Sequence, residues 1–124
     1  MKNTMEENYT VKVVKDVESG RVLSRAWFNA AGQEHNTSGP ALVKYCSDGK
    51  PKEQRWMVDG KIHRPEEEGP AVIDYDPDDD TLMLTYFYLN RIHRVHGPAI
   101  QIKSASSGAV VSERYFRNGE PFQP

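Results

Sequence analysis

The amino-acid sequence predicts an all-β protein: an antiparallel meander of repeated β-hairpins, with about eight strands in a single curved sheet and little or no helix. The first reason is an internal repeat whose leading aromatics, Phe28, Trp56, Tyr86 and Tyr115, recur every 28 to 30 residues. A repeat of this period indicates stacked supersecondary units. The second is the β-branched and aromatic bias of the segments between turn residues. The third is that no segment shows sustained 3.6-residue periodicity.

The repeat is clearest in residues 56–64, WMVDGKIHR, and in residues 86–94, YFYLNRIHR. A looser copy covers residues 28–35, and a truncated copy covers residues 115–122 near the end of the chain. Each of the first three copies carries a histidine and, a few residues later, Gly-Pro-Ala; the histidines are His35, His63 and His93, and the glycines are Gly39, Gly69 and Gly97. The copies therefore share both their aromatic start and their closing element.

Each copy has the residues of a strand that ends in a tight turn. Asp59-Gly60 and Asn118-Gly119 supply the positive φ angles that such a turn needs. Asn90 stands at the position of Gly60, and asparagine tolerates this conformation better than most residues. In Gly-Pro-Ala, glycine permits a sharp return and proline suits the first residue of a strand. One repeat is therefore predicted to be about one β-hairpin.

The pattern of an aromatic residue, a turn glycine, His-Arg and Gly-Pro-Ala resembles the MORN-type repeats, in the variant form of the YwqK-like families of bacterial and viral proteins. The resemblance covers residues 21–122. It is weaker at both ends: the first copy has an extra residue near Trp27 and no arginine after His35, and the last has Phe122 in place of histidine and no Gly-Pro-Ala. It implies a single-sheet scaffold and no particular activity, because such repeats serve unrelated partners.

Taken in order, residues 1–8 form a polar lead that we expect to fray. Residues 1–29 contain a capping hairpin, residues 30–117 contain three hairpin repeats (41–58, 71–89 and 99–117), and residues 118–124 form the C-terminal end of one domain spanning residues 1–124. Pro121 and Pro124 are expected to discourage further strand pairing at that edge. A short helical turn is compatible with residues 31–38 or 64–68.

Strand alternation predicts which aromatics share a face of the sheet. Phe28, Trp56, Tyr86 and Tyr115 would form a ladder on one face, with Met57, Phe87 and Phe116 on the other. Both faces are therefore partly apolar. We expect either a sheet that curls on itself or a face covered by the connections or by a partner.

Composition favours a cytoplasmic globular domain. The chain has 124 residues, 37% hydrophobic and 27% charged, with a formal charge of −2, which gives no bulk attraction to nucleic acid. Cys46 is the single cysteine, so an intramolecular disulfide is impossible and a reducing compartment is favoured. The first eight residues lack the apolar segment of a signal peptide, and no apolar run is long enough to span a membrane.

The histidine positions predict structural roles rather than a metal or cofactor site. Equivalent residues two strands apart lie roughly 9 to 10 Å from each other, too far to share one zinc ion. We expect each histidine to hydrogen-bond the neighbouring connection instead. Residues 76–80 have the alternating carboxylates of a calcium loop, but Thr81 and Phe87 replace the glycine and glutamate that such a loop requires.

The strongest charge feature is a stretch from residue 66 to residue 80 with eight acids and no lysine or arginine. We predict an acidic docking patch for a basic protein surface. Its members would be Glu66, Glu67, Glu68, Asp76, Asp78, Asp79 and Asp80.

No nucleophile, metalloprotease, phosphate-loop or dinucleotide motif is present, so the sequence predicts a protein-binding module and not an enzyme. Small size and the resemblance suggest an antitoxin-like or phage-encoded inhibitor of a host enzyme. The alternative is a single-stranded nucleic-acid-binding sheet that uses an arginine and aromatic stripe around Arg55, Arg91, Arg94, Lys103 and Arg114. Open sheet edges also make self-association plausible.

Overall fold

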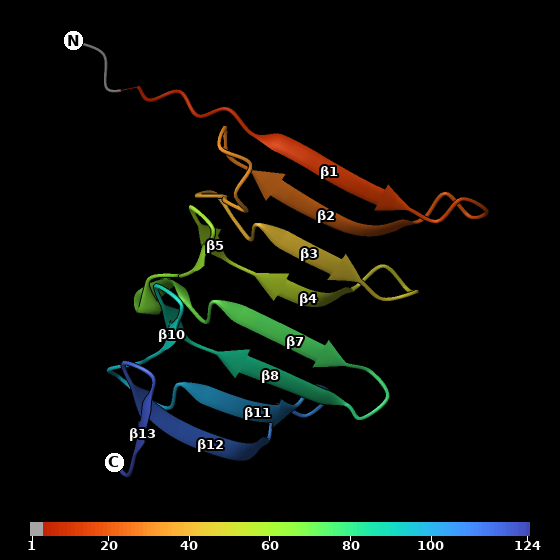
Figure 1. Ribbon diagram of the computed structural model, residues 1–124. Helices are drawn as coiled ribbons and strands as arrows, with labels where there is room; N and C mark the ends of the chain where they lie inside the picture. The colour runs from red at the N-terminus through yellow and green to blue at the C-terminus, as the bar shows by residue number, and fades with distance from the viewer. Residues whose placement is uncertain (1–3) are drawn as a thin grey trace.

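The computed structural model describes residues 4–124 as an antiparallel meander, in which each strand pairs with the next one along the main sheet (Figure 1). The nine strands of this main sheet follow the order β1 (Thr10–Lys15), β2 (Val22–Phe28), β3 (Leu42–Tyr45), β4 (Pro51–Arg55), β7 (Val72–Asp76), β8 (Thr81–Thr85), β11 (Ile100–Ser104), β12 (Val110–Arg117) and β13 (Glu120–Phe122). The predicted fold class is confirmed.

Two short hairpins project from the main sheet between its long hairpins. One pairs β5 (Met57–Val58) with β6 (Lys61–Ile62), and the other pairs β9 (Phe87–Tyr88) with β10 (Arg91–Ile92). Figure 1 shows them at one end of the sheet, together with β13, while the turns of the long hairpins lie at the opposite end. Each unit therefore has a long and a short hairpin, so the prediction of one hairpin per repeat is wrong.

The chain leaves the main sheet at Trp56 and at Tyr86, which interrupt strands that the sequence predicts as continuous. The N–H of Trp56 donates to the carbonyl of Ala71 at 2.8 Å, and the N–H of Tyr86 donates to Ala99 in the same way. These bonds hold the last backbone group of the long hairpin while the next residues turn into the short hairpin. The bends explain why the main sheet and the short hairpins are separate sheets.

The same hydrogen bond identifies Trp27, rather than Phe28, as the aromatic that begins the first unit. The N–H of Trp27 donates to Ala41 at 2.8 Å, and the N–H of His35 donates to the carbonyl of Trp27, as the N–H of His63 does to Trp56. Phe28 is thus equivalent to Met57, and the predicted ladder that includes Phe28 is wrong at that position. The extra residue of this copy lies in its turn, between Asn29 and Gln33, whose backbones are bonded at 2.9 Å.

The core is thin and consists mainly of small side chains. Ala41, Ala71 and Ala99 of the three Gly-Pro-Ala elements are 0% exposed. The other buried residues are Ala26, Val43, Met57, Phe116, His35 and Thr85. Across residues 4–124 no large side chain is completely buried. Hydrogen bonds between units are therefore important for holding the units together.

The short hairpins cover part of one face of the main sheet. Of the expected alternatives for the apolar faces, the structure therefore shows cover by the connections. Side chains of both layers line a common hollow of about 440 Å³; they include Ile62, Phe87 and Ile92 from the short hairpins and Val72, Thr85 and Ile100 from the main sheet. The connections therefore provide the cover at this end of the sheet.

The two ends of the stack are closed differently. Residues 1–3 lie outside the described part, and the expectation that residues 1–8 fray is wrong for Glu7, whose carboxylate accepts hydrogen bonds from Tyr9 and Thr37 at 2.8 Å each. At the other end, Pro121 lies within β13, opposite Phe116. It takes the position of Ile62, whose N–H points to the following unit and donates to Asn90. In residues 4–124 β13 is the edge strand of the sheet, where a residue without an N–H is tolerated.

Helical structure in the described residues is limited to one 3₁₀ turn, η1 (Glu66–Glu68), which falls in one of the two segments expected to permit it. Across residues 4–124 there is no helix long and apolar enough to span a membrane.

Candidate functional site

The repeated histidines connect neighbouring units. Nδ1 of His35, His63 and His93 accepts the backbone N–H of Asp59, Leu89 and Asn118, at 2.9, 3.3 and 3.0 Å respectively. Each donating N–H belongs to the turn of the following unit. The expectation that each histidine hydrogen-bonds the neighbouring connection is confirmed.

The arginines that follow two of these histidines hold the Gly-Pro-Ala elements in place. Arg64 lies 3.9 Å from the ring centroid of Trp56 and donates to the carbonyl of Pro70 at 3.0 Å. Arg94 repeats this arrangement on Tyr86 and Pro98, with distances of 4.0 and 3.2 Å. A guanidinium over an aromatic face contributes about 0.5 to 2 kcal/mol. Burial lowers the pKa of Arg64 from its ordinary value, and the nearby Glu68 opposes that shift.

In the first unit Asn36 takes the place of arginine, and its side-chain amide donates to the carbonyl of Pro40 at 3.1 Å. The missing arginine of the first copy is therefore replaced by a shorter donor to the same carbonyl. The repeated histidines, arginines and glycines form a structural framework, in which the histidine and arginine side chains make contacts within the protein.

The predicted acidic patch is not continuous, because strand β7 separates its two halves. Glu66 to Glu68 form η1 before β7, whereas Asp78 and Asp79 lie in the turn after it. A five-residue strand is about 16 Å long, and Figure 1 shows η1 and this turn at opposite ends of the sheet. The sequence places these acids close together, but the extended strand keeps them apart.

Three of the predicted docking acids are used inside the molecule. Glu66 accepts the N–H groups of Val95 and His96 at 2.8 Å each. Asp80 accepts from the hydroxyls of Ser104 and Ser106 and from the N–H of Ser106, at 2.7 to 3.0 Å. Asp76 accepts two N–H groups of its own turn. Asp76 and Asp80 are nevertheless exposed, as are Glu67, Glu68, Asp78 and Asp79, and the role of these acids in partner binding stays a prediction.

Replacing Glu66 with glutamine should lower the free energy of unfolding at pH 7 by about 1 kcal/mol, because one of two charge-assisted bonds is lost at a partly exposed site. Burial raises the pKa of Glu66, but the N–H groups of Val95 and His96 outweigh it, so the pKa lies below its ordinary value. A lowered acid pKa stabilises the fold above the unfolded value of about 4.3 and ceases to do so as the pH falls further. Urea unfolding should show the difference shrinking below about pH 4.

The matched control for this prediction is Glu67→Gln, which removes the same charge from an exposed neighbour in η1. We expect its effect to stay within about 0.5 kcal/mol. Equal losses in the two variants would mean that general charge, and not the bonds to the third unit, explains the effect of Glu66.

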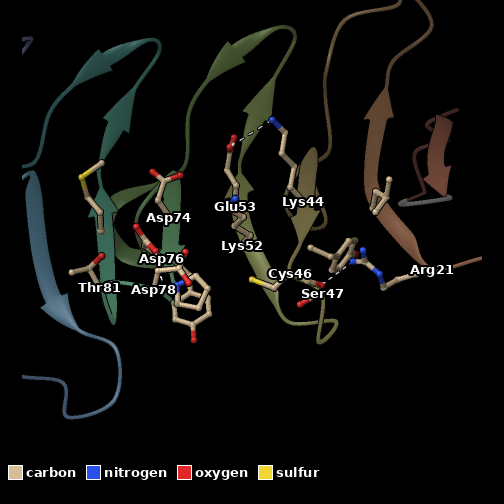
Figure 2. Close-up of a pocket in the computed structure, with 15 residues that line it drawn as sticks. Arg21, Lys44, Cys46, Ser47, Lys52, Glu53, Asp74, Asp76, Asp78 and Thr81 are labelled. Carbon is tan, nitrogen blue, oxygen red and sulfur yellow. Dashed lines mark hydrogen bonds and ion pairs between the residues drawn. The ribbon is translucent and has the colours of Figure 1, made fainter. Parts of the chain in front are cut away.

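A hollow of about 770 Å³, here called the charged groove, crosses the main sheet near the turns of the long hairpins. Figure 2 shows its three aspartates on one side, on β7 and the turn that follows, Glu53 and Lys52 on β4 in the middle, and Lys44 and Arg21 toward the other side. The acids are Glu53, Asp74, Asp76 and Asp78, and the basic residues are Arg21, Lys44 and Lys52. The groove thus presents both signs of charge.

Strand register builds the centre of the charged groove. Lys44 pairs with Glu53, Glu53 with Asp74, and Asp74 with Met83, so the four side chains form one row across β3, β4, β7 and β8. Lys44 Nζ lies 3.9 Å and Arg55 2.7 Å from the carboxylate of Glu53. Asp74 has no ion pair within 4 Å among the described residues. Burial, followed by the negative charge of Glu53, raises the pKa of Asp74 above its ordinary value, although Arg55 opposes this.

Because the pKa of Asp74 is raised in the folded state, its ionisation costs stability as the pH rises through that value. Replacing Asp74 with asparagine should therefore raise the free energy of unfolding at pH 7 by a few tenths to about 1 kcal/mol, since the group is partly exposed and screened. The gain should vanish below about pH 4, where the carboxyl is protonated in both states. Urea unfolding at the two pH values tests this, with the exposed Asp79→Asn as the control.

No protein-family model, curated protein or solved structure matches this chain. The internal repeat is therefore the source of comparison. Lys44, Asp74 and Ile102 each follow the alanine of Gly-Pro-Ala by three residues, and they differ in charge, while the framework residues around them are kept. This position therefore varies from unit to unit, and the surface around it differs accordingly, while the framework residues stay the same.

Sequence reasoning missed Asp74, Glu53 and the basic side of the charged groove. Asp74 belongs to the acidic stretch, but its pairing with Glu53 depends on a strand from the preceding unit. The sequence does contain one signal: Lys44 and Asp74 each lie three residues after the alanine of a Gly-Pro-Ala element. With the strand register known, this shared position places both side chains on the same face of the sheet.

Metal ligands and the cysteine thiol are the remaining candidates for chemistry. The described residues contain no group of three or more histidine, cysteine, aspartate or glutamate side chains placed to hold a metal ion. Cys46 is half-buried at the rim of the charged groove, and its carbonyl accepts a bond from Arg21 at 3.3 Å.

The arginine and aromatic stripe is mostly engaged within the protein. Arg55 pairs with Glu53, Arg94 covers Tyr86, and Arg114 lies 5.2 Å from the ring centroid of Phe116. These three arginines therefore already have partners within the protein.

Proposed function

We propose that this protein is a non-enzymatic binding module that docks a basic protein surface against the acidic side of the charged groove. The observation that carries the proposal is Asp74, a partly buried carboxylate beside Glu53 with no cation of its own. A lysine or arginine from a partner would supply that cation and would exclude water from the partly buried carboxylate, which strengthens charge pairing. The cost of holding Asp74 ionised in the free protein would then be recovered on binding.

Two further features support the proposal. Asp78 and Asp79 are exposed in the turn next to the groove, where they can attract a basic surface over long range. The four side chains of the row from Lys44 to Met83 also line the charged groove, where a partner can reach them. A small protein that presents one such surface suits the narrower proposal of an inhibitor of a host enzyme.

The test is an affinity measurement with a purified partner recovered from the native host. Reversing Asp78 and Asp79 to lysine should weaken binding at least about tenfold, mainly through slower association that depends on salt. Asp74→Asn should weaken binding while stabilising the free protein, a combination that general misfolding cannot produce. The matched control reverses Glu67 and Glu68, which carry the same charge at the other end of β7.

Equal weakening by both charge reversals would contradict docking at the groove. Failure to recover any stoichiometric partner would count against the binding module itself. Salt-dependent binding of single-stranded RNA or DNA, unaffected by Asp74→Asn, would favour the nucleic-acid alternative instead. If the partner is an enzyme, its activity in the complex tests the inhibitor proposal directly.

A further inference from the structure

A second hollow, here called the His63 recess, lies between the second and third units and has a volume of about 380 Å³. It shares no lining residue with the charged groove. Its walls include His63 and His93, with Phe87 and the 53% exposed Tyr88. The ring of Tyr88 meets both imidazoles edge-on, with centroid distances of 4.9 Å to His63 and 6.1 Å to His93. The recess is thus aromatic and open to solvent.

The hydrogen bonds between units determine which atoms these imidazoles present. Nδ1 of His63 accepts the N–H of Leu89, and Nδ1 of His93 accepts the N–H of Asn118. A neutral imidazole that accepts at Nδ1 carries its proton at Nε2 and donates there. Neither Nε2 has an acceptor among the described side chains. The His63 recess therefore offers two N–H donors beside an aromatic wall.

The first unit shows what binds to such a histidine. Nε2 of the equivalent His35 lies 3.2 Å from a carboxylate oxygen of Glu7, and the ring of Tyr9 is stacked on the imidazole with centroids 5.9 Å apart. The hydroxyl of Thr37 donates to the same carboxylate at 2.8 Å. The chain's own N-terminal segment therefore occupies the site at the first histidine, as a glutamate followed two residues later by an aromatic.

Among residues 4–124 no carboxylate is paired with His63, although the ring of Tyr88 already lies beside its imidazole. We propose that the His63 recess binds an extended acidic segment of a partner protein, in which a glutamate accepts the Nε2 proton of His63 and an aromatic residue two positions later packs against the recess. This proposal does not depend on the charged groove, and it makes the N-terminal segment an internal copy of the ligand.

The charge at the rim of the recess should affect acidic and basic ligands in opposite directions. Glu66 is committed to the N–H groups of Val95 and His96, whereas the exposed Glu67 also lines the recess and would repel an acidic ligand. Neutralising Glu67 should therefore tighten binding of an acidic segment and weaken binding of a basic one.

The experiment titrates the labelled full-length protein with a synthetic peptide of residues 4–10, TMEENYT, and follows the ring signals of His63, His93 and Tyr88 by NMR. Saturable shifts at His63 and Tyr88 are expected. His63→Asn, which keeps an acceptor for the N–H of Leu89 but removes the Nε2 donor, should weaken the peptide about tenfold or more. A peptide with Glu7→Gln should lose a similar factor, and its matched control, the Glu6→Gln peptide of equal charge, should not.

On the protein side, Glu67→Gln should tighten the peptide about two- to fivefold, whereas Glu68→Gln, which lies outside the recess, should leave the affinity unchanged. The proposal is overturned if shifts appear only around His35 and Tyr9, since the peptide would then merely displace its own segment. It is also overturned if Glu67→Gln weakens binding. Sedimentation that shows dimers dependent on residues 4–10 without peptide would assign the recess to a second copy of the chain and overturn a foreign partner.

Discussion

Replacing Gly69 with alanine should destabilise the protein by about 3 kcal/mol, a loss large enough to lower the melting temperature by about 10 °C. Gly69 has φ 128° and ψ −172°, a region open essentially to glycine alone, and occupying it with another residue costs about 1 to 3 kcal/mol. An alanine Cβ would also lie 2.8 Å from a terminal nitrogen of Arg64. The guanidinium would have to leave both Trp56 and the carbonyl of Pro70, which adds about 1 to 2 kcal/mol. Thermal and urea unfolding measure the loss.

The repeat supplies its own control for this prediction. Gly39 holds the equivalent position in the first unit, its φ is not in the left-handed region, and an added Cβ would meet only the Asn36 amide at 3.9 Å. Gly39→Ala should therefore change the free energy of unfolding by no more than about 0.5 kcal/mol. Similar losses at Gly39 and Gly69 would contradict the explanation that glycine is needed at position 69 to leave room for the guanidinium of Arg64.

Replacing Ala71 with leucine should cost about 2 to 3 kcal/mol through overpacking. Ala71 is 0% exposed, and its N–H and carbonyl are bonded to Thr85 and Trp56 at 2.9 and 2.8 Å. The larger side chain can be accommodated only if the backbone moves, and that movement breaks the bonds that join the start of β7 to the ends of β4 and β8. Circular dichroism during urea unfolding and the fluorescence of Trp56 should report this change together.

The control is Ala109→Leu, at an exposed position just before β12. It adds the same side chain where there is room for it, so its effect should stay within about 0.5 kcal/mol. A stable Ala71→Leu variant with unchanged Trp56 fluorescence would mean that the strands can separate at the Gly-Pro-Ala element without cost.

The histidines show how far the sequence alone supports a structural argument. Their repeated positions, 28 and 30 residues apart, and the distance between equivalent strands predict bonds to the neighbouring connection, and the structure shows these bonds. The choice of Nδ1 as acceptor was not predictable, because it depends on where the following turn places its N–H. That choice leaves Nε2 of His63 as a donor in the recess.

The acids show the opposite case. Glu66 and Asp80 are separated by few residues in the chain, so charge counting places them in one patch. The extended strand β7 lies between them, and Glu66 reaches the third unit while Asp80 reaches Ser104 and Ser106. Local sequence cannot reveal such partners, because they belong to the following unit and are reached only when the strands pair.

By itself the sequence determined the β-hairpin repeat, its period and the structural role of its histidines, because turn residues, aromatic positions and strand spacing are local properties of each copy. Only the tertiary structure decided that the chain bends at Trp56 and Tyr86, that Trp27 begins the first unit, and that Asp74 lies beside Glu53. The physical reason is that these features depend on hydrogen-bond register between strands of different units. A change of one residue in that register would move every side chain to the other face.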